Sequence, residues 1–332
     1  METVLTIIQG KGTLPREQAG RNIHYDDASL ANYKKVEQGD FIIHLRSFEG
    51  GLEMANEDGI VSPAYTILRC KKPHSSLFYE AYFHTDEFIN HILSKSVEGI
   101  RDGRQISYEA FKWLGLPYCD VSEQERIAQL FCTLSHRIEK QQQMVDALKK
   151  YKRGLIKLVF EKVMSEAHYQ LPLSDLCISI SSGRTTVNES NGRYPLFGST
   201  GIVGMTNTIE HDGDIVMVAR VGANAGKVNF FSGRCGVTDN TLVIRVKENT
   251  IHPKFLAYFL ENFDLHKLIL GSGQPLVTGG QLKKIQSPVI AYKAQLLITR
   301  SLESLDRIIG TQDTYMEKLI QLKSGLMQRL FI

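Results

Sequence analysis

The chain has 332 residues, of which 42% are hydrophobic and 23% charged, and its formal net charge is +3. This composition suits packed globular domains, about two at this length, and the mild positive charge permits a nucleic-acid partner without requiring one. The five cysteines form no CxxC pair, which argues against a disulfide framework or a zinc site and favours a reducing cytoplasm. The sequence shows neither a secretory signal nor an apolar stretch of membrane-spanning length, so we expect a cytoplasmic protein with no membrane partner.

The first predicted domain, residues 1–120, consists of short β-branched strands punctuated by Gly, Asn and Asp. In GDFIIHLR (39–46), a Gly-Asp turn precedes an apolar strand that ends on an arginine. A second strand, VSPAYTILR (61–69), and a helix over 80–93 follow. This alternation predicts a mixed α/β domain.

A long helix is predicted next, in the spacer segment 121–167. Apolar residues recur there at alternating intervals of four and three, and such spacing over more than four heptads is typical of a coiled coil. The predicted seam includes Ile127, Phe131, Leu134, Ile138, Gln141 and Leu148. The basic run KKYKR (149–153) is interpreted as a solvated helix end, with docking of a partner subunit as the alternative.

The second predicted domain, residues 168–291, repeats the first. The matches pair GDFIIHLR with GDIVMVAR (213–220), VSPAYTILR with VTDNTLVIR (237–245), and the helix over 80–93 with one over 256–269. Arg46 and Arg220 therefore occupy the same place in the repeat, at the end of an apolar strand. A structural role, in which each arginine holds its strand to the domain, is the alternative to a binding role.

Residues 197–204, FGSTGIVG, have the glycine content of a loop that could hold a phosphate. The stretch lacks the Lys and Ser/Thr that would place a triphosphate and its metal, and a polar stretch rather than an amphipathic helix follows it. We therefore interpret it as a turn within the second domain, with Ser199 and Thr200 available to a partner.

A second long helix, in residues 292–332, repeats the first at a constant offset of 171 residues. The offset superposes Gln124 on Gln295 and Lys152 on Lys323. The matching seam includes Leu302, Leu305, Ile309, Gln312 and Leu319. The matched seams predict that the helices pair as an antiparallel coiled coil, in which a buried Gln in each seam helps to fix the register. The alternative is one amphipathic helix on each of two separate cores.

The expected fold class is mixed α/β (α+β), with two globular domains alternating with two long helices in a pseudo-two-fold internal repeat. If the helices are antiparallel, the globular domains lie at opposite ends of a rod.

This pattern resembles the specificity subunit of type I restriction-modification enzymes, over nearly the whole chain. The stretches that carry the resemblance are YPLFGSTGIVG (194–204), VTDNTLVIR (237–245), GSGQP (271–275) and KKYKRGLIKLVF (149–160). The resemblance implies two target-recognition domains that read a bipartite DNA sequence, with helical spacers that hold the modification subunits. It also implies that a restriction subunit joins for ATP-driven translocation and cleavage.

One departure concerns the first half of the chain. In the family, each recognition half opens with a segment like LPLSDLCISISSGRT (171–185), whereas the first half here begins with METVLTIIQGKG, which resembles 194–204. We expect an N-terminally shortened first recognition domain, or one that borrows the missing strand from elsewhere.

The sequence contains no set of residues typical of catalysis. The nearest match to an adenine-methyltransferase tetrad is SPAY (62–65), which has Ser in place of Asp or Asn and a single proline. P-loop, HExxH and GxSxG motifs are all missing from the sequence. We therefore expect no catalytic residue and no metal site in this chain. On the resemblance, S-adenosylmethionine, ATP and Mg would belong to partner subunits.

Polar and basic residues on loops at strand ends are the candidates for contact with double-stranded DNA, because phosphate contacts set affinity and base-edge contacts set sequence. In the second domain the candidates are Arg184, Ser199, Thr200, Arg220, Asn224, Lys227 and Gln274. In the first domain they are Gln9, Lys11, Arg46, Arg101 and Arg104. For each one the alternative is a solvated loop residue.

The predicted function is that of a non-catalytic, sequence-specific DNA-binding subunit of a type I restriction-modification complex. Its expected partners are DNA, modification (methyltransferase) subunits and restriction/translocase subunits, and self-association through the helices stays open. The alternatives are a coiled-coil scaffold with protein-binding globular ends, and a truncated or phase-variable inactive copy of the specificity subunit.

Overall fold

The computed structural model describes residues 2–19, 27–99, 105–186, 188–269 and 275–331. The chain forms two compact units. Unit 1 comprises residues 1–143 and 313–332, and unit 2 comprises residues 144–312. Among the described residues, no helix is both long and apolar enough to cross a membrane.

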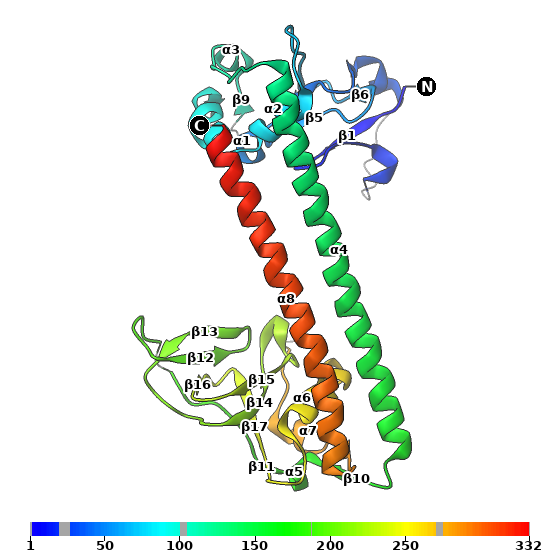
Figure 1. The fold of residues 1–332 in the computed structure, drawn as a ribbon, viewed down its shortest axis with the longest axis vertical. Coiled ribbons are helices and arrows are strands. Elements are labelled where there is room, and N and C mark those ends of the chain that lie inside the picture. The colour runs from blue at the N-terminus through cyan, green and yellow to red at the C-terminus, as the bar shows by residue number, and fades with distance from the viewer. Residues whose placement is uncertain (1, 20–26, 100–104, 187, 270–274, 332) are drawn as a thin grey trace. The chain divides into compact units, whose positions relative to one another are not determined.

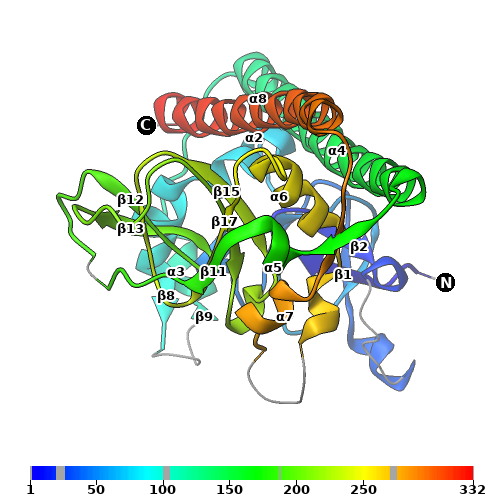
Figure 2. The ribbon, with the colours of Figure 1, turned by 90° about the horizontal axis from the view of Figure 1, so that it is seen from below.

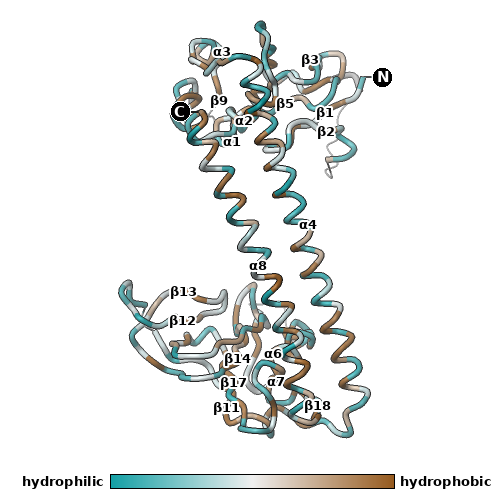
Figure 3. Tube along the Cα trace, in the orientation of Figure 1, coloured by the Kyte–Doolittle hydropathy of each residue, from teal (hydrophilic) through white to brown (hydrophobic). Residues whose placement is uncertain are grey.

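Two long helices, α4 (Val121–Glu166) and α8 (Tyr292–Leu330), each contribute residues to both units. Within each unit the two helices run antiparallel (Figure 1). Apolar positions recur along both of them (Figure 3), and every residue of the two predicted seams is buried or half-buried. The prediction of two long, antiparallel helices with apolar seams is confirmed.

In unit 1, the start of α4 packs against the end of α8. The rings of Phe131 and Phe331 stack with centroids 5.7 Å apart. Nζ of Lys323 donates a hydrogen bond of 2.8 Å to Oγ of Ser135. Both contacts join residues near opposite ends of the two helices, as antiparallel packing requires.

Unit 2 has the equivalent contact with a charge in place of the hydroxyl. Nζ of Lys152 lies 2.7 Å from Oδ1 of Asp306 and 3.4 Å from Oε2 of Glu261, and the lysine side chain is only 18% exposed. The offset of 171 that superposes Lys152 on Lys323 also superposes Ser135 on Asp306. The interpretation of KKYKR as a solvated helix end is wrong at Lys152, because this lysine points into the seam and joins three helices.

The largest described sheet of unit 2 is a four-stranded antiparallel sheet with the order β11-β17-β14-β15. The strands of unit 2 are β10 (Gln170–Pro172), β11 (Cys177–Ser182), β12 (Tyr194–Gly198), β13 (Gly201–Thr206), β14 (Asp214–Ala219), β15 (Val228–Ser232), β16 (Gly236–Val237), β17 (Thr241–Val246) and β18 (Gln286–Pro288). Its short helices are α5 (Leu173–Leu176), the 3-10 turns η6 (Gly222–Asn224) and η7 (Leu265–Leu268), α6 (Pro253–Asn262) and α7 (Gly279–Lys283).

Two cores fill the two faces of that sheet. On one face, α6 lies between the sheet and the long helices (Figure 2), and Val216, Ile244 and Phe255 are among its fully buried residues. On the other face, Met217 and Val243 pack against Phe197 from a smaller sheet with the order β13-β12-β16. Successive residues of β14 and β17 therefore point alternately into one core and the other, as expected of strands covered on both faces.

The sheets of unit 1 are smaller, and among the described residues the largest has the order β5-β4-β7. The strands of unit 1 are β1 (Leu5–Ile8), β2 (Gly12–Pro15), β3 (Lys34–Val36), β4 (Phe41–Ile43), β5 (Glu53–Met54), β6 (Gly59–Val61), β7 (Thr66–Leu68), β8 (Val97–Glu98) and β9 (Gln105–Ile106). Its short helices are η1 (Arg16–Gln18), η2 (Asp27–Asn32), α1 (Ser47–Gly50), α2 (Ser76–Phe83), the π-helical η3 (Glu87–Ile92), η4 (Leu93–Ser96) and α3 (Tyr108–Phe111).

The helix expected over 80–93 is interrupted in the structure. The α2 helix ends at Phe83, where the hydroxyl of Thr85 donates to the carbonyl of Tyr82 and accepts from the N–H of Phe88. A threonine side chain that bonds to nearby backbone groups competes with the helical hydrogen bonds. In unit 2, α6 begins earlier than expected, at Pro253, because proline is well suited to the first helical position.

Two buried glutamines repeat one local arrangement in the two units. Gln124, near the start of α4, accepts the N–H of Ser75 (2.9 Å), the residue before α2, and donates to the carbonyl five residues earlier. Gln295, near the start of α8, accepts the N–H of His252 (2.8 Å), the residue before α6, and likewise donates five residues back. Each glutamine therefore ties the start of a long helix to the start of a short one, which is why the sequence repeat keeps it.

Candidate nucleic-acid interface

The turn between β16 and β17, residues Thr238–Asn240, is where several loops of unit 2 meet. The N–H of Thr238 donates to the carbonyl of Phe197 (2.8 Å), at the end of β12. Arg220 donates its backbone N–H to the carbonyl of Asn240 (2.8 Å) and its Nη1 to that of Asp239 (3.4 Å). A Cβ added to Gly183 would lie 2.7 Å from the carbonyl oxygen of Thr238. Three loops, at Gly183, Phe197 and Arg220, therefore lie against this turn.

Besides Arg220, three further predicted residues lie on those loops. Arg184 directly follows Gly183 and its side chain is exposed. Ser199 and Thr200 form the tip of the hairpin that β12 and β13 make, and Thr200 is exposed. The prediction that FGSTGIVG is a turn is confirmed, and the segment after it is a strand. A helix N-terminus, which would favour a nucleotide phosphate, does not follow this loop.

The loop after Arg220 has the backbone geometry of a tight turn. The N–H of Gly226 donates to the carbonyl of Ala219 (2.8 Å), and the N–H of Lys227 donates to that of Asn224 (2.9 Å). Gly226 has a φ of 88°, which glycine adopts without strain. As a result Lys227 is exposed and Asn224 is half-buried beside it.

A further segment of unit 2 lies alongside this loop. The N–H of Gly222 donates to the carbonyl of Pro275 (3.1 Å), and the N–H of Val277 donates to that of Arg220 (2.8 Å). The candidate Gln274 lies outside the described residues, directly before this segment. We define the unit 2 face as the loops that carry Arg184, Ser199, Thr200, Arg220, Asn224, Lys227 and Thr238–Asn240.

Glu210 supports one edge of this face through hydrogen bonds to the segments around Arg184 and Val237. The sequence-based candidates do not include it. Its carboxylate accepts the N–H of Arg184 (2.9 Å), the hydroxyl of Thr185 (2.7 Å) and the N–H of Val237 (3.4 Å). Burial by itself would raise the pKa of Glu210, but these hydrogen bonds to the charged form outweigh it and the pKa is lowered. No local pattern marks such a residue, because the groups that donate hydrogen bonds to it, on Arg184, Thr185 and Val237, come from distant parts of the sequence.

In unit 1, the predicted residues Gln9 and Lys11 lie at the exposed tip of the hairpin that β1 and β2 form. The side chain of Gln9 lies against α1, since a Cβ added to Gly50 would come within 1.8 Å of its Nε2. Arg46 is the residue before α1 and is exposed. Three candidates of unit 1 are therefore grouped around one hairpin and one helical turn, while Arg101 and Arg104 lie outside the described residues.

The expectation that Arg46 ends its strand is wrong. Strand β4 ends at Ile43, and the chain then turns, because the hydroxyl of Ser47 accepts the N–H of His44 (2.9 Å) while the N–H of Ser47 donates to the carbonyl of His44 (3.1 Å). Such a side-chain bond offers the backbone an alternative to the strand. Arg220, in contrast, directly follows the last residue of β14.

The strand pairing shows why the sequence match misplaced this arginine. Phe41 of β4 faces Leu68 of β7, as Val216 of β14 faces Ile244 of β17. Phe41 therefore corresponds to Val216, one residue beyond the position that the sequence match assigned to it. The arginines that follow these strands consequently do not occupy the same place in the two units.

A buried carboxylate supports the unit 1 hairpin. Glu53 is 0% exposed and accepts the N–H groups of Gly10 (2.7 Å) and Gly12 (2.9 Å), near the hairpin tip. It also contacts Nε2 of His84 at 3.2 Å, and Nδ1 of His84 lies 2.8 Å from the carbonyl of Glu80. Since both ring nitrogens face acceptors, the geometry calls for a protonated His84.

The pKa shifts of this pair agree with that geometry. Burial by itself would raise the pKa of Glu53 and lower that of His84, but their mutual hydrogen bond reverses both directions. The lowered pKa of Glu53 adds stability at pH values above its ordinary pKa of 4.5. That stability is lost as the pH falls through the folded pKa. The raised pKa of His84 adds stability below about 6.5, which is lost as the pH rises through the folded pKa.

Replacing Glu53 with glutamine is expected to destabilise the hairpin by about 1–2 kcal/mol between pH 5 and 6, because the amide keeps one acceptor but loses the charge. The difference from the wild type should shrink at higher and lower pH. Hydrogen exchange of residues 5–15, measured from pH 4 to pH 8, checks this. Glu57→Gln, at an exposed position, is the control; equal effects of the two substitutions would contradict the assignment.

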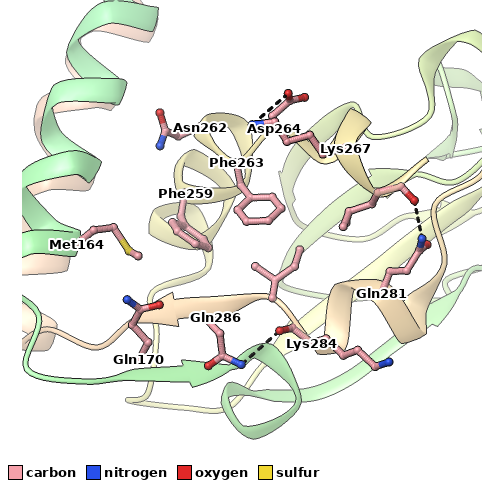
Figure 4. Close-up of a pocket in the computed structure, with 12 residues that line it drawn as sticks. Met164, Gln170, Phe259, Asn262, Phe263, Asp264, Lys267, Gln281, Lys284 and Gln286 are labelled. Carbon is pink, nitrogen blue, oxygen red and sulfur yellow. Dashed lines mark hydrogen bonds and ion pairs between the residues drawn. The ribbon is translucent and has the colours of Figure 1, made fainter. Parts of the chain in front are cut away.

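Unit 2 also contains a pocket of about 580 Å³, bounded by the end of α4, α6, α7, β10 and β18. Phe259 and Phe263 lie on its apolar side, and Asp264 and Lys267 face each other at its rim (Figure 4). The lining residues include none of the predicted site residues. Within the described part of the chain, no cluster of His, Cys, Asp and Glu is arranged to hold a metal ion.

Comparisons with known proteins connect this geometry to a family. Residues 170–319 match the model of the type I restriction modification DNA specificity domain. The chain is 28% identical over 123 residues to the type I restriction enzyme EcoprrI specificity subunit of Escherichia coli, a match that covers 37% of this chain and 30% of the relative. It is 28% identical over 156 residues to the MjaVIII specificity subunit of Methanocaldococcus jannaschii, covering 43% of this chain and 36% of the relative.

The fold itself is similar to a solved structure. The crystal structure of the type I restriction-modification system S subunit from M. genitalium has a TM-score of 0.64 and 14% identity, and the match covers 90% of this chain and 84% of that one. The sequence matches to the curated relatives cover about a third of their lengths. The matched domain contains the whole unit 2 face.

Proposed function

From the membership of this chain in the type I restriction-modification specificity-subunit family, we propose that it reads a bipartite DNA target, one half-site with each unit. The proposed contacts are made by Arg184, Ser199, Thr200, Arg220, Asn224, Lys227 and Gln274 in unit 2, and by Gln9, Lys11, Arg46, Arg101 and Arg104 in unit 1. The long helices set the distance between the half-sites and hold the modification and restriction subunits.

The observation that carries this proposal is the convergence of loops on the β16–β17 turn. It brings an arginine, hydroxyl groups and backbone polar groups from separate segments into one exposed face, inside the domain that matches the family model. Arginine reads guanine through two hydrogen bonds, and hydroxyl and amide groups bind phosphates and base edges. Such a face suits a DNA groove better than a small ligand, for which a concave pocket is usual.

We further propose that this chain performs no catalysis. Methyl transfer and strand cleavage, with their S-adenosylmethionine, ATP and Mg, would then belong to the partner subunits. The family membership supports this division.

Replacing Arg220 with alanine is expected to relax sequence preference at one half-site only, with about a 5- to 150-fold loss of discrimination there. The complex reconstituted with modification subunits is mixed with a pool of randomised duplexes, and the retained duplexes are sequenced. The other half-site should keep its preference, because unit 1 is unchanged.

Arg300→Ala, at an exposed position on α8, is the matched control and should leave both half-sites unchanged. Equal loss of binding on all sequences after Arg220→Ala would indicate a structural arginine instead. The proposal as a whole fails if neither the protein nor its reconstituted complex binds duplex DNA with an affinity that falls as salt rises, because phosphate contacts release counterions.

A further inference from the structure

Strand β17 of unit 2 is paired along both of its edges. One edge pairs with β14 and the other with β11, where Cys177 faces Val246 and Ile180 faces Ile244. Its counterpart in unit 1 is β7, since the two belong to the matched stretches VSPAYTILR and VTDNTLVIR. Strand β7 pairs with β4 on one edge, and no strand among the described residues pairs with its other edge. In the described part of unit 1, the sheet edge that corresponds to the position of β11 in unit 2 is therefore open.

A second stretch of unit 1 also lacks, among the described residues, the strand partner that its counterpart in unit 2 has. In unit 2, β10 pairs with β18, and the N–H of Leu173 donates to the carbonyl of Ile285 (3.0 Å). The offset of 171 residues that superposes the long helices places Gly115–Pro117 on β18. Within the described parts of unit 1 no strand pairs with this stretch, and the side chain of Leu116 is 39% exposed.

A pocket in unit 1 is lined by residues from both places, Leu68 of β7 and Leu116. It has a volume of about 240 Å³, and its apolar walls also include Tyr79 and Phe111. Cys70, which follows the end of β7 by two residues, also lines it. In unit 2 the corresponding space is filled: Leu173 and Leu176 of α5 are 0% and 4% exposed in the main core. In its described residues, unit 1 therefore has three features that correspond to occupied positions in unit 2. The free edge of β7 corresponds to the position of β11, residues 115–117 correspond to the partner of β10, and the apolar pocket corresponds to the position of α5.

We propose that unit 1 carries an acceptor site for a strand–turn–strand segment with the chemistry of Gln170–Ser182, supplied by a protein of different sequence. The segment would add a strand to β7, insert two leucines spaced three apart into the pocket, and pair with residues 115–117. Addition of a strand to an exposed edge is a common mode of peptide recognition, in which main-chain bonds give affinity and pockets give specificity. The segment of this chain itself is already in use, because Leu173, Leu176, Cys177 and Ile180 are buried in the core of unit 2.

This site is independent of DNA binding, and the register of β11 makes it testable. Cys177 faces Val246 in unit 2, and the counterpart of Val246 in unit 1 is Cys70, which is exposed and free. Facing residues of antiparallel strands have Cα atoms about 4.5–5.5 Å apart, within the range of a disulfide. A synthetic peptide of residues 168–183, added to the full chain under mild oxidation, should therefore form a one-to-one disulfide between its Cys177 and Cys70.

Three matched reagents test the register and the pocket. Cys70→Ser protein should abolish the cross-link. A peptide with Cys177→Val and Ile178→Cys should cross-link poorly. In unit 2 the register is irregular directly after Cys177, and the side chain of Ile178 is 62% exposed whereas that of Cys177 is 5% exposed. A labelled peptide with Cys177→Ser should bind without a covalent bond in a fluorescence anisotropy titration, and adding Leu173→Asp and Leu176→Asp should weaken that binding at least tenfold.

Binding of the labelled peptide should also slow hydrogen exchange in β7 and leave exchange in β17 unchanged. No binding, binding that ignores the two leucines, or a disulfide formed at the other exposed cysteine, Cys132, would each overturn the proposal. A Cys70–Cys177 bond between two copies of the chain, formed without any peptide, would show that a second copy supplies the segment. That result would overturn the assignment of the segment to a protein of different sequence. All of these measurements are made without DNA, so their failure leaves the proposed function intact.

Discussion

Replacing Phe160 with alanine is expected to lower the free energy of unfolding of unit 2 by about 3–5 kcal/mol. The Phe160 ring, near the end of α4, is 0% exposed, and its centroid lies 5.2 Å from that of Phe255 and 5.7 Å from that of Phe259. Its loss leaves a cavity between the long helix and α6 and removes two aromatic contacts. Urea unfolding followed by hydrogen exchange and mass spectrometry measures the effect on each unit separately.

Leu158→Ala is the control for this substitution. Leu158 lies on the same helix two residues earlier, but its side chain is 66% exposed, so truncation should change stability by less than about 0.5 kcal/mol. Comparable effects of the two substitutions would contradict the packing of α4 on α6. The offset of 171 predicts a similar loss in unit 1 for Phe331→Ala, whose ring contacts Phe78 at 5.1 Å.

Replacing Gln295 with leucine is expected to destabilise unit 2 by about 2–4 kcal/mol. The side chain of Gln295 is 1% exposed, and leucine would leave the N–H of His252 and the carbonyl of Ile290 without their present partners. Each buried polar group left unpaired costs about 1–3 kcal/mol. Faster hydrogen exchange at the start of α6, together with a lower urea midpoint for unit 2, is the expected observation.

Gln124→Leu provides the matched variant in unit 1. It should accelerate exchange at the start of α2, where Ser75 loses its partner, and leave α6 unchanged. Gln295→Glu adds a further check, because it keeps the acceptor for His252 but replaces the donor. If Gln295→Leu is as stable as the wild type, the glutamine does not hold the two helices together.

The parts of the fold that the sequence predicted well are those in which the pattern is local. The 4-3 spacing and the constant offset of 171 identify both long helices because a buried helix face imposes its period on neighbouring residues. The same offset pairs Gln124 with Gln295 and Lys152 with Lys323, and the structure places each pair in a similar contact. The hairpin at FGSTGIVG was likewise readable from its glycines and flanking strands.

The candidate site was predictable only in part. The exposed residues Arg184, Thr200 and Lys227 could be named from loop composition, but their grouping around Thr238–Asn240 depends on hydrogen bonds between distant segments. The polar Thr-Asp-Asn triplet between two strands was a turn signal that could have singled out this hub. Glu53 and Glu210 had no such signal, since each carboxylate is explained by donor groups from distant segments, such as the N–H of Gly10 for Glu53 and the N–H of Arg184 for Glu210.

The spacing of residues along the chain is enough to specify the repeat, the two long helices and the kinds of residue that face solvent at the strand ends. Three features follow from contacts between distant segments instead. Arg46 and Arg220 are not equivalent, Lys152 lies in a helix seam, and no described strand pairs with the second edge of β7. These three outcomes depend on strand register and on packing between distant segments. A shift of one residue in register changes which side chain follows a strand without changing the hydrophobic pattern that a sequence displays.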